Sequence, residues 1–161
     1  MNAEWGTLFT VEAETAATLT GLVFVAISIN LDRIMVYPGL PGRASESILQ
    51  FIEVFLISVA ALIPGQSDWV LGIEFLVIGV IFWVAQITGQ VRYLRLKAGH
   101  PRWWFVLRSI LSQLATVPLC LSGIALLSGV TSALYWVIPG FLFSFAAGIV
   151  SAWVLLVEIR R

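Results

Sequence analysis

The sequence predicts an all-α protein, a polytopic helical bundle with five transmembrane helices. Of its 161 residues, 60% are hydrophobic and 11% are charged, and its mean hydropathy is +0.99. An average soluble domain carries about a quarter charged residues, so this chain has too few of them to cover a water-facing surface. Several stretches also reach about 20 apolar residues, the length that crosses a hydrocarbon core of about 30 Å. We therefore expect a single membrane domain over 1–161.

Five segments have this length and composition, at about 9–31, 47–64, 69–90, 104–127 and 133–157. The first is the least apolar because it carries two glutamates and several hydroxyl residues. The short breaks 64–68 and 128–132 consist of turn-forming residues and predict tight hairpins. The joins 32–46 and 91–103 are longer and hold most of the charge, so we expect them to be polar connectors.

The placement of Lys and Arg predicts the orientation, because these residues in short loops favour the cytoplasmic face. With five spans and an outer N-terminus, all nine basic residues fall at one face. A count of four or six spans would place the terminal Arg160 and Arg161 opposite at least one basic loop. No Lys or Arg precedes the first apolar run, unlike in a cleaved signal peptide, so we expect the first span to be retained. The sequence thus predicts a multi-pass protein of the cell (plasma or inner) membrane, with the N-terminus outside and the C-terminus cytoplasmic.

The counts of reactive residues exclude much chemistry. Cys120 and His100 are the single Cys and His, too few for an intrachain disulfide, a zinc site or a bis-histidine haem. The single Lys, Lys97, lies in a polar join, which argues against a Schiff base inside the membrane. A net charge of zero provides no field that attracts nucleic acid. We expect no cofactor, no metal, no nucleic acid and no enzymatic activity, unless carboxylates bind a metal between subunits.

Charged and polar residues inside the spans are the functional candidates, because a charge at membrane depth costs about 3 kcal/mol on insertion scales. In the first span, polar positions recur at steps of three and four and form one stripe. The second span repeats this rhythm in its cytoplasmic half, and Gln86 and Gln90 end the third. The first two helices could face a shared polar seam. The predicted ion pathway comprises Glu14, Thr18, Ser28, Asp32, Gln50, Glu53 and Glu74.

Each of these residues has a less specific interpretation. A carboxyl group can reach an interface, bond to a neighbouring helix or carry its proton in place. The Ser and Thr hydroxyls can join helices through hydrogen bonds of about 0.6 to 2 kcal/mol in lipid.

The second long join is basic with interleaved aromatic residues. At the inner membrane surface, such a stretch binds anionic lipid headgroups, with about 1 kcal/mol per basic residue. The predicted headgroup contacts are Arg92, Arg95, Lys97, Arg102, Trp103 and Trp104.

The fifth span carries a stripe of small residues, which allow helix backbones to approach closely. They predict a packing face, either within the subunit or between subunits: Gly140, Ser144, Ala147, Gly148 and Ser151. Pro118 and Pro139 predict kinks in the fourth and fifth spans. Trp83, in the middle of its span, is interpreted as packing between helices.

The function that these features favour is a small homo-oligomeric channel or pore-like transporter for small ions, either cations or protons, lined by the first helix. Five spans hardly enclose a pore and its gates, so a symmetric ring is the simplest arrangement. The predicted outer segments are acidic and lack Lys and Arg, which favours cations at an entrance. The alternative is a non-catalytic accessory or assembly subunit of a larger membrane complex, which the lack of reactive side chains supports.

Overall fold

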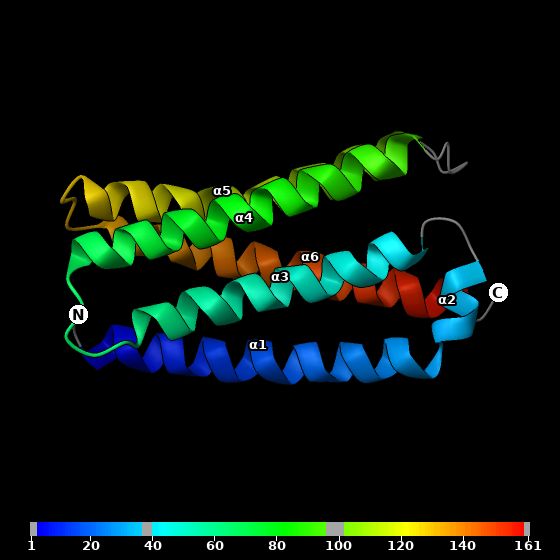
Figure 1. Cartoon of the computed structure of the whole chain (residues 1–161), viewed down its shortest axis with the longest axis horizontal. Coiled ribbons are helices and arrows are strands. Elements are labelled where there is room, and N and C mark those ends of the chain that lie inside the picture. Colours follow the sequence, from blue (N-terminus) through cyan, green and yellow to red (C-terminus); the bar gives the residue numbers. More distant parts are fainter. Residues whose placement is uncertain (1–2, 37–39, 96–101, 160–161) are drawn as a thin grey trace.

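The computed structural model describes residues 3–36, 40–95 and 102–159, and these residues form a helical bundle (Figure 1). The elements in order are α1 (Ala3–Ile29), α2 (Leu31–Val36), α3 (Leu40–Ala61), α4 (Asp68–Arg95), α5 (Arg102–Leu127), the 3-10 helix η1 (Ala133–Trp136) and α6 (Val137–Ile159). Within the described residues, α1, α3, α4, α5 and α6 provide five helices that are long and apolar enough to cross a membrane. The expected all-α class and the five candidate spans are therefore confirmed.

The helices extend further into the polar joins than the apolar segments do. The third helix begins at Leu40 rather than near residue 47, and α2 occupies part of the join 32–46, so the expectation of a connector there was wrong. Hydropathy marks only the apolar part of a helix, whereas the backbone hydrogen bonds continue through polar residues such as Arg43 and Glu46.

Both short breaks form the expected tight connections. Gly65 has a φ of 74° and Gly129 a φ of 70°, the left-handed conformation that a residue without a side chain adopts at little cost. At the end of α5, the Gly129 amide donates to the Leu126 carbonyl and the Val130 amide to the Ala125 carbonyl, each at 3.0 Å. This pair of bonds is a Schellman motif, which stops a helix and satisfies its last carbonyls.

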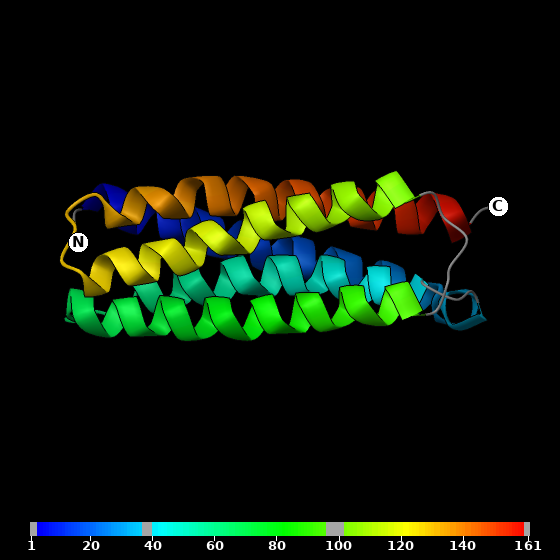
Figure 2. The same cartoon turned by 90° about the horizontal axis from the view of Figure 1, so that it is seen from above.

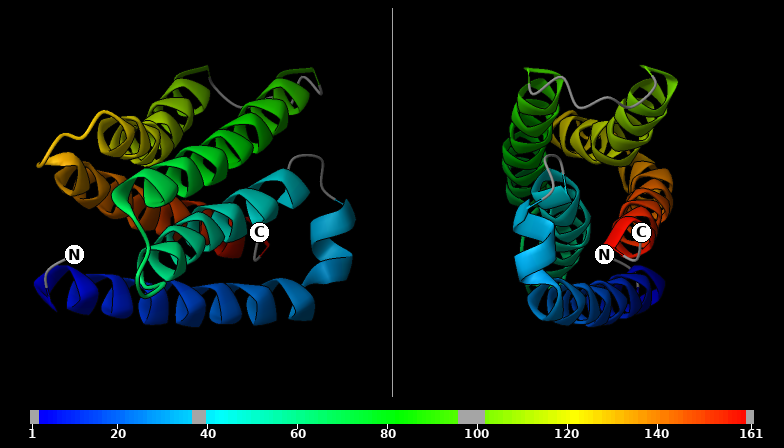
Figure 3. Two further views of the ribbon diagram at one scale, coloured as in Figure 1. Left: turned by 60° about the vertical axis from the view of Figure 1, so that its left-hand side comes forward. Right: turned by 90° about the vertical axis from the view of Figure 1, so that its right-hand side faces the viewer.

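Four helices form the body of the molecule and one lies against its side. The third helix packs against α4 and α6, and α5 packs against the same two helices, so α3 to α6 enclose a common interior. The first helix packs mainly on α3, at the edge of this four-helix body, as the views in Figures 2 and 3 show.

Small residues bring the helices of this body close together. A Cβ atom at Gly123 of α5 would lie 2.9 Å from the Gly72 carbonyl oxygen of α4, and one at Gly79 would lie 2.6 Å from the Cys120 sulfur. Pro118 lies within α5, which continues through it. Pro139 lies in the first turn of α6, where a missing N–H costs nothing. The kink expected at Pro139 is therefore not required.

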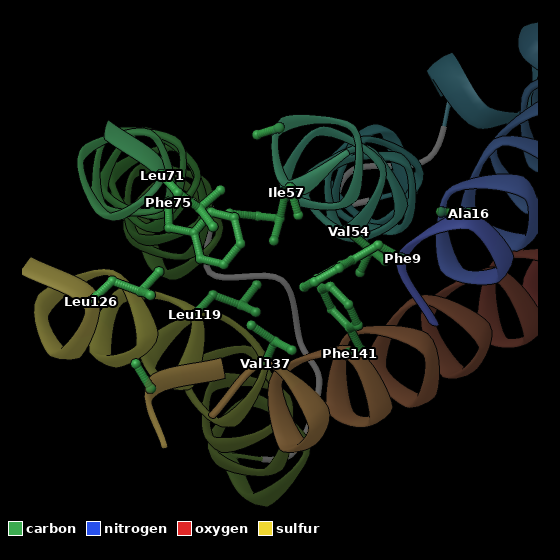
Figure 4. Packing of buried hydrophobic residues seen from close by; sticks show 13 residues of the cluster. Phe9, Ala16, Val54, Ile57, Leu71, Phe75, Leu119, Leu126, Val137 and Phe141 are labelled. Atoms are coloured by element: carbon green, nitrogen blue, oxygen red, sulfur yellow. The ribbon is translucent and has the colours of Figure 1, made fainter. Parts of the chain in front are cut away.

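Aliphatic and aromatic residues fill the apolar interior, where Phe9, Phe75 and Phe141 come together (Figure 4). Phe9 of α1 is fully buried, with its ring centroid 6.4 Å from that of Phe75 on α4 and 6.1 Å from that of Phe141 on α6, both in edge-to-face geometry. Beyond Ala16 no residue of α1 is buried. The first half of α1 is thus anchored in the body, while its second half rests on the surface.

Candidate functional site

A cluster of polar side chains lies inside the four-helix body where α3, α4 and α5 meet. It consists of Gln50 and Glu53 from α3, Gln86 from α4, and Ser112 and Thr116 from α5, and we call it the polar core. All five side chains are buried, and Gln50, Glu53 and Thr116 have no exposed surface. Buried polar groups cost free energy unless they are hydrogen-bonded to one another, so this cluster depends on its internal bonds.

Gln86 is the centre of these bonds. Its Nε2 donates to Glu53 Oε2 at 3.2 Å and to Thr116 Oγ1 at 2.8 Å. Its Oε1 accepts from Gln50 Nε2 at 3.1 Å and from the Ser112 hydroxyl. A primary amide has two N–H donors and one oxygen that accepts two bonds, so the Gln86 amide is fully used and holds three helices together.

Glu53 is the acidic group of the polar core. Its Oε2 accepts from Gln86 and also from Thr116 Oγ1 at 2.9 Å. Its other oxygen, Oε1, is buried, and no group among the described residues donates to it. One oxygen of this carboxyl group is thus fixed by two donors, while the other remains available for a proton or a cation.

An ion pair lies nearer to the end where α3 and α5 begin. The guanidinium of Arg108 on α5 contacts the carboxylate of Glu46 on α3, and both side chains are largely buried. Glu46 precedes Glu53 by seven residues, about 10 Å along a helix axis. Charged and polar groups therefore follow one another from this end of the body to Glu53.

A small cavity adjoins both the ion pair and the polar core. Its volume is about 30 Å³, and its polar lining includes Ser45, Glu46, Gln86, Gln90 and Arg108. The Nε2 of Gln90 is buried and has no hydrogen-bond partner among the described residues. A cavity needs about 10–15 Å³ to hold a water molecule, so this one has room for a water beside the polar groups of Gln86, Gln90 and Arg108.

The interior beyond Glu53 is mostly apolar. Val54 and Ile57, which follow on α3, are fully buried in the apolar cluster that contains Phe75 and Leu119. Ser58 and Ser122 are also buried on this side, but neither hydroxyl has a hydrogen-bond partner among the described residues. The hydrogen-bonded and charged groups therefore connect Glu53 to the end where α3 and α5 begin, and the interior on the other side is mostly aromatic and aliphatic.

The structure brings Gln50 and Glu53 together but places the predicted residues of the first span elsewhere. Glu14, Thr18 and Ser28 are exposed on α1, and Asp32 is exposed on α2. The hydroxyl groups of Thr18 and Ser28 each donate to a carbonyl of their own helix at 2.8 Å.

The first two spans therefore do not form the expected shared seam within one chain. The reason is that Phe9, Ala13 and Ala16 provide the face of α1 that packs on the body. Glu14 and Ala16 are two residues apart and so lie about 200° apart around the helix.

The remaining acidic candidate, Glu74, is half-buried on α4. It lies twelve residues before Gln86, about 18 Å along the axis, and is separate from the polar core.

Five of the six residues predicted to contact lipid headgroups lie at the end of α4 or in the first turn of α5. Arg92 is exposed near the end of α4, and Arg95 is the last residue of that helix. Arg102, Trp103 and Trp104 form the first turn of α5, and Lys97 lies outside the described residues. Headgroup binding stays a prediction for this group.

The small residues of the fifth span face the interior of the body. A Cβ at Gly140 would lie 2.6 Å from the Leu119 side chain of α5, and one at Gly148 would lie 2.5 Å from the Phe51 ring of α3. Ser144 and Ala147 are buried, and Ser151 is half-buried. In addition, Trp83 Nε1 of α4 donates to Gln113 Oε1 of α5 at 2.7 Å, a contact between neighbouring helices.

Sequence reasoning did not select Arg108, Ser112 and Thr116, the contribution of α5 to the site. A hydroxyl in a membrane helix often bonds to its own backbone, as in α1, so a Ser or Thr alone predicts little. The signal that would have found these residues is their spacing of four, which places them on one face of α5 in line with an arginine.

Comparisons of the chain with known protein families, curated proteins and solved structures find no match.

Proposed function

We propose that this chain is a multi-pass membrane protein that transports protons or small cations, with Glu53 as the group that binds the ion inside the membrane. The observation that carries the proposal is the state of this carboxyl group. It is completely buried, fixed through one oxygen by Gln86 and Thr116, and unbonded at the other oxygen among the described residues. Ionisable residues at membrane depth mark ion and proton pathways.

The distribution of charge supports an orientation with the N-terminus outside and the C-terminus cytoplasmic. Arg33 in α2, Arg43 in α3, Arg92 in α4 and Arg108 in α5 all belong to the end of the body where α1 ends and α3 begins (Figure 1). Basic residues near the ends of spans favour the cytoplasmic side. The polar end of the interior then opens toward the cytoplasm.

The arrangement supports a binding step from that side. An ion or a water enters beside the Glu46–Arg108 pair, occupies the cavity and reaches Gln86, which contacts Glu53. Donation from Gln86 and Thr116 stabilises negative charge on Glu53 Oε2 once its proton leaves. Release to the other side requires the apolar side chains beyond Glu53 to separate, so transport needs a second conformation of the body.

The binding group lies within one subunit, so this pathway does not require α1 to line a pore. Flux measurements test the proposal directly. The purified protein is reconstituted in lipid vesicles, and proton and alkali-cation fluxes are measured with the wild type and with Glu53→Gln. We expect flux above that of empty vesicles for the wild type and none for Glu53→Gln, because an amide cannot release a proton or balance a cation's charge.

Two further variants make the test specific. Glu12→Gln is the matched control, since Glu12 lies on α1, outside the polar core, and we expect it to retain the wild-type flux. Thr116→Val removes one donor to Glu53, and we expect an intermediate flux. A wild type without flux, or a Glu53→Gln variant that transports normally, would contradict the proposal, and a silent wild type that binds another membrane protein would favour the accessory role.

A further inference from the structure

Two buried glutamates of α3 lie two turns apart on the same face of the helix, and only one of them has a basic partner. Glu46 contacts the guanidinium of Arg108. Glu53 is completely buried, and the groups that donate to it among the described residues, Gln86 and Thr116, are uncharged. A buried carboxylate without a positive partner is far more costly than a paired one. Glu53 therefore needs either a bound cation or a proton of its own.

The helices around Glu53 bring no basic side chain to it within the described ranges. Helices α1 and α6 contain no Lys or Arg, and Arg108 of α5 already pairs with Glu46. The remaining described arginines lie near helix ends, at least six residues along the chain from the polar core: Arg33, Arg43, Arg92, Arg95 and Arg102. The other titratable groups of these helices carry no positive charge: Glu4, Glu12, Glu14, Asp32, Asp68, Glu74, Tyr93, Cys120 and Glu158. The species that neutralises Glu53 is therefore not a side chain.

The groups that face Glu53 do not suit a metal cation. A cation inside a protein is held by several oxygen atoms that replace its hydration shell. Gln86 instead directs its NH2 group, and Thr116 its hydroxyl hydrogen, toward Glu53 Oε2. The Gln86 oxygen already accepts from Gln50 and Ser112. The polar core thus presents hydrogen atoms to Glu53 where a cation requires oxygen atoms.

The nearby cavity also stops short of Glu53. Its lining includes Glu46, Gln86 and Arg108 but neither Gln50 nor Glu53. A water in this cavity therefore reaches the edge of the polar core, while a cation bound to Glu53 needs space that this cavity does not provide.

A proton fits the same surroundings. Gln50 donates to Gln86 through Nε2, so Gln50 Oε1 remains an acceptor. This oxygen and Glu53 Oε1 are both buried, and neither has a donor among the described residues. Residues three apart on a helix are neighbours. A proton on Glu53 Oε1 turns one of these two acceptors into a donor and occupies almost no volume.

We propose that the ion held by Glu53 in this conformation is a proton on Oε1, with Gln50 Oε1 as the acceptor of its hydrogen bond, and that this site excludes alkali cations. The inference rests on the proposed role of Glu53 in transport and names the ion that it carries.

Thermal melts of two matched variants of the full chain test the proposal. Glu53→Gln and Glu46→Gln make the same chemical change at two buried positions of α3. We expect Glu53→Gln to melt within about 3 °C of the wild type, because an amide is neutral like a protonated carboxyl group and supplies an N–H in place of the O–H. Glu46→Gln removes the carboxylate of a buried ion pair and should melt about 10 °C lower. A loss for Glu53→Gln as large as that for Glu46→Gln would overturn the proposal.

Infrared spectra of the protein in lipid vesicles at neutral pH detect the proton itself. We expect the wild type to show an absorption band of a protonated carboxyl group that is lost in Glu53→Gln and kept in the control Glu12→Gln. Gln50→Leu should shift this band, because the O–H loses its acceptor. A wild type without the band, or a band that persists in Glu53→Gln, would overturn the proposal, and an unshifted band in Gln50→Leu would overturn the role given to Gln50.

Replacing choline chloride by sodium or potassium chloride at equal concentration tests the exclusion of cations. We expect neither the melting temperature nor the infrared band of the wild type to change. A cation that raises the melting temperature of the wild type but not that of Glu53→Gln would overturn the proposal. These readouts do not require transport: an absence of flux contradicts the proposed function, whereas cation binding at Glu53 contradicts this inference and leaves transport standing.

Discussion

The first and third helices carry the same kind of sequence pattern and occupy opposite environments. Both have polar residues at steps of three and four along a membrane-length helix. Of the residues in the most apolar stretch of each helix, 17% are buried in α1 and 61% are buried in α3. As a result, Glu14 faces outward from the subunit, while Glu53 is completely enclosed in the polar core.

The difference shows that the spacing of polar residues identifies a face but not its direction. Whether a polar face points inward or outward depends on which side chains on the other faces of the helix can pack against neighbouring helices. The opposite side of α1 presents Phe9, Ala13 and Ala16, which fit the apolar interior. The third helix packs against α1, α4 and α6, and its polar face meets complementary groups on Gln86 and Thr116.

The largest expected change in the free energy of unfolding concerns the packing of α1 against the four-helix body. We predict that Phe9→Ala lowers the free energy of unfolding by about 3–5 kcal/mol, the usual cost of removing a fully buried phenylalanine ring. Phe24→Ala, on the same helix but 62% exposed, should change it by less than about 0.5 kcal/mol. Equilibrium unfolding in mixed detergent micelles measures both, and similar losses for the two variants would show that α1 is not anchored through Phe9.

The same change, Thr to Val, made once in the polar core and once on the exposed face of α1, measures how much a buried hydroxyl contributes to the free energy of unfolding. Thr116→Val removes the donor to Glu53 Oε2 and the acceptor of Gln86 Nε2, so it should destabilise the fold by about 1–3 kcal/mol through unsatisfied buried groups. Thr18→Val removes a hydroxyl bonded only to its own helix among the described residues and should be nearly neutral for unfolding. The same unfolding assay applies, and equal effects would argue against a polar core that depends on its bonds.

A smaller effect distinguishes close packing from open surface. Gly148→Ala places a Cβ 2.5 Å from the Phe51 ring and should cost about 1 kcal/mol or more by overpacking. At Gly6 of α1 an added Cβ meets nothing within 4 Å, so Gly6→Ala should stabilise the helix by up to about 1 kcal/mol. Opposite signs in the unfolding assay are the expected result, and a stabilising Gly148→Ala would disprove the close contact between α6 and α3.

Much of this architecture follows from local sequence. Apolar length predicts the five long helices, and the glycines at 65 and 129 match the predicted hairpins because a left-handed turn favours glycine. The buried face of α3 follows from its spacing as well, since Gln50, Glu53 and Ile57 are all enclosed.

Other features depend on contacts between distant segments. Gln86 becomes the centre of the site only because the fold brings Gln50, 36 residues before it, and Thr116, 30 residues after it, within hydrogen-bonding distance. Ser112 and Thr116 gain their role from contact with the same side chain of Gln86. On α5 itself, only their spacing of four in line with Arg108 distinguishes them from the hydroxyls of α1. The sequence did not predict the short helix α2, because its six residues are too few to show a helical periodicity.

The central claim is that the group that binds the ion is the enclosed carboxyl of α3 rather than the exposed carboxyl of α1. The most direct measurement compares the ion flux of Glu53→Gln and Glu14→Gln in vesicles of the same composition. We predict that Glu53→Gln reduces the flux to that of empty vesicles and does so far more than Glu14→Gln. If Glu14→Gln abolished the flux while Glu53→Gln preserved it, the pathway would run along α1, and the account given for the polar core would be wrong.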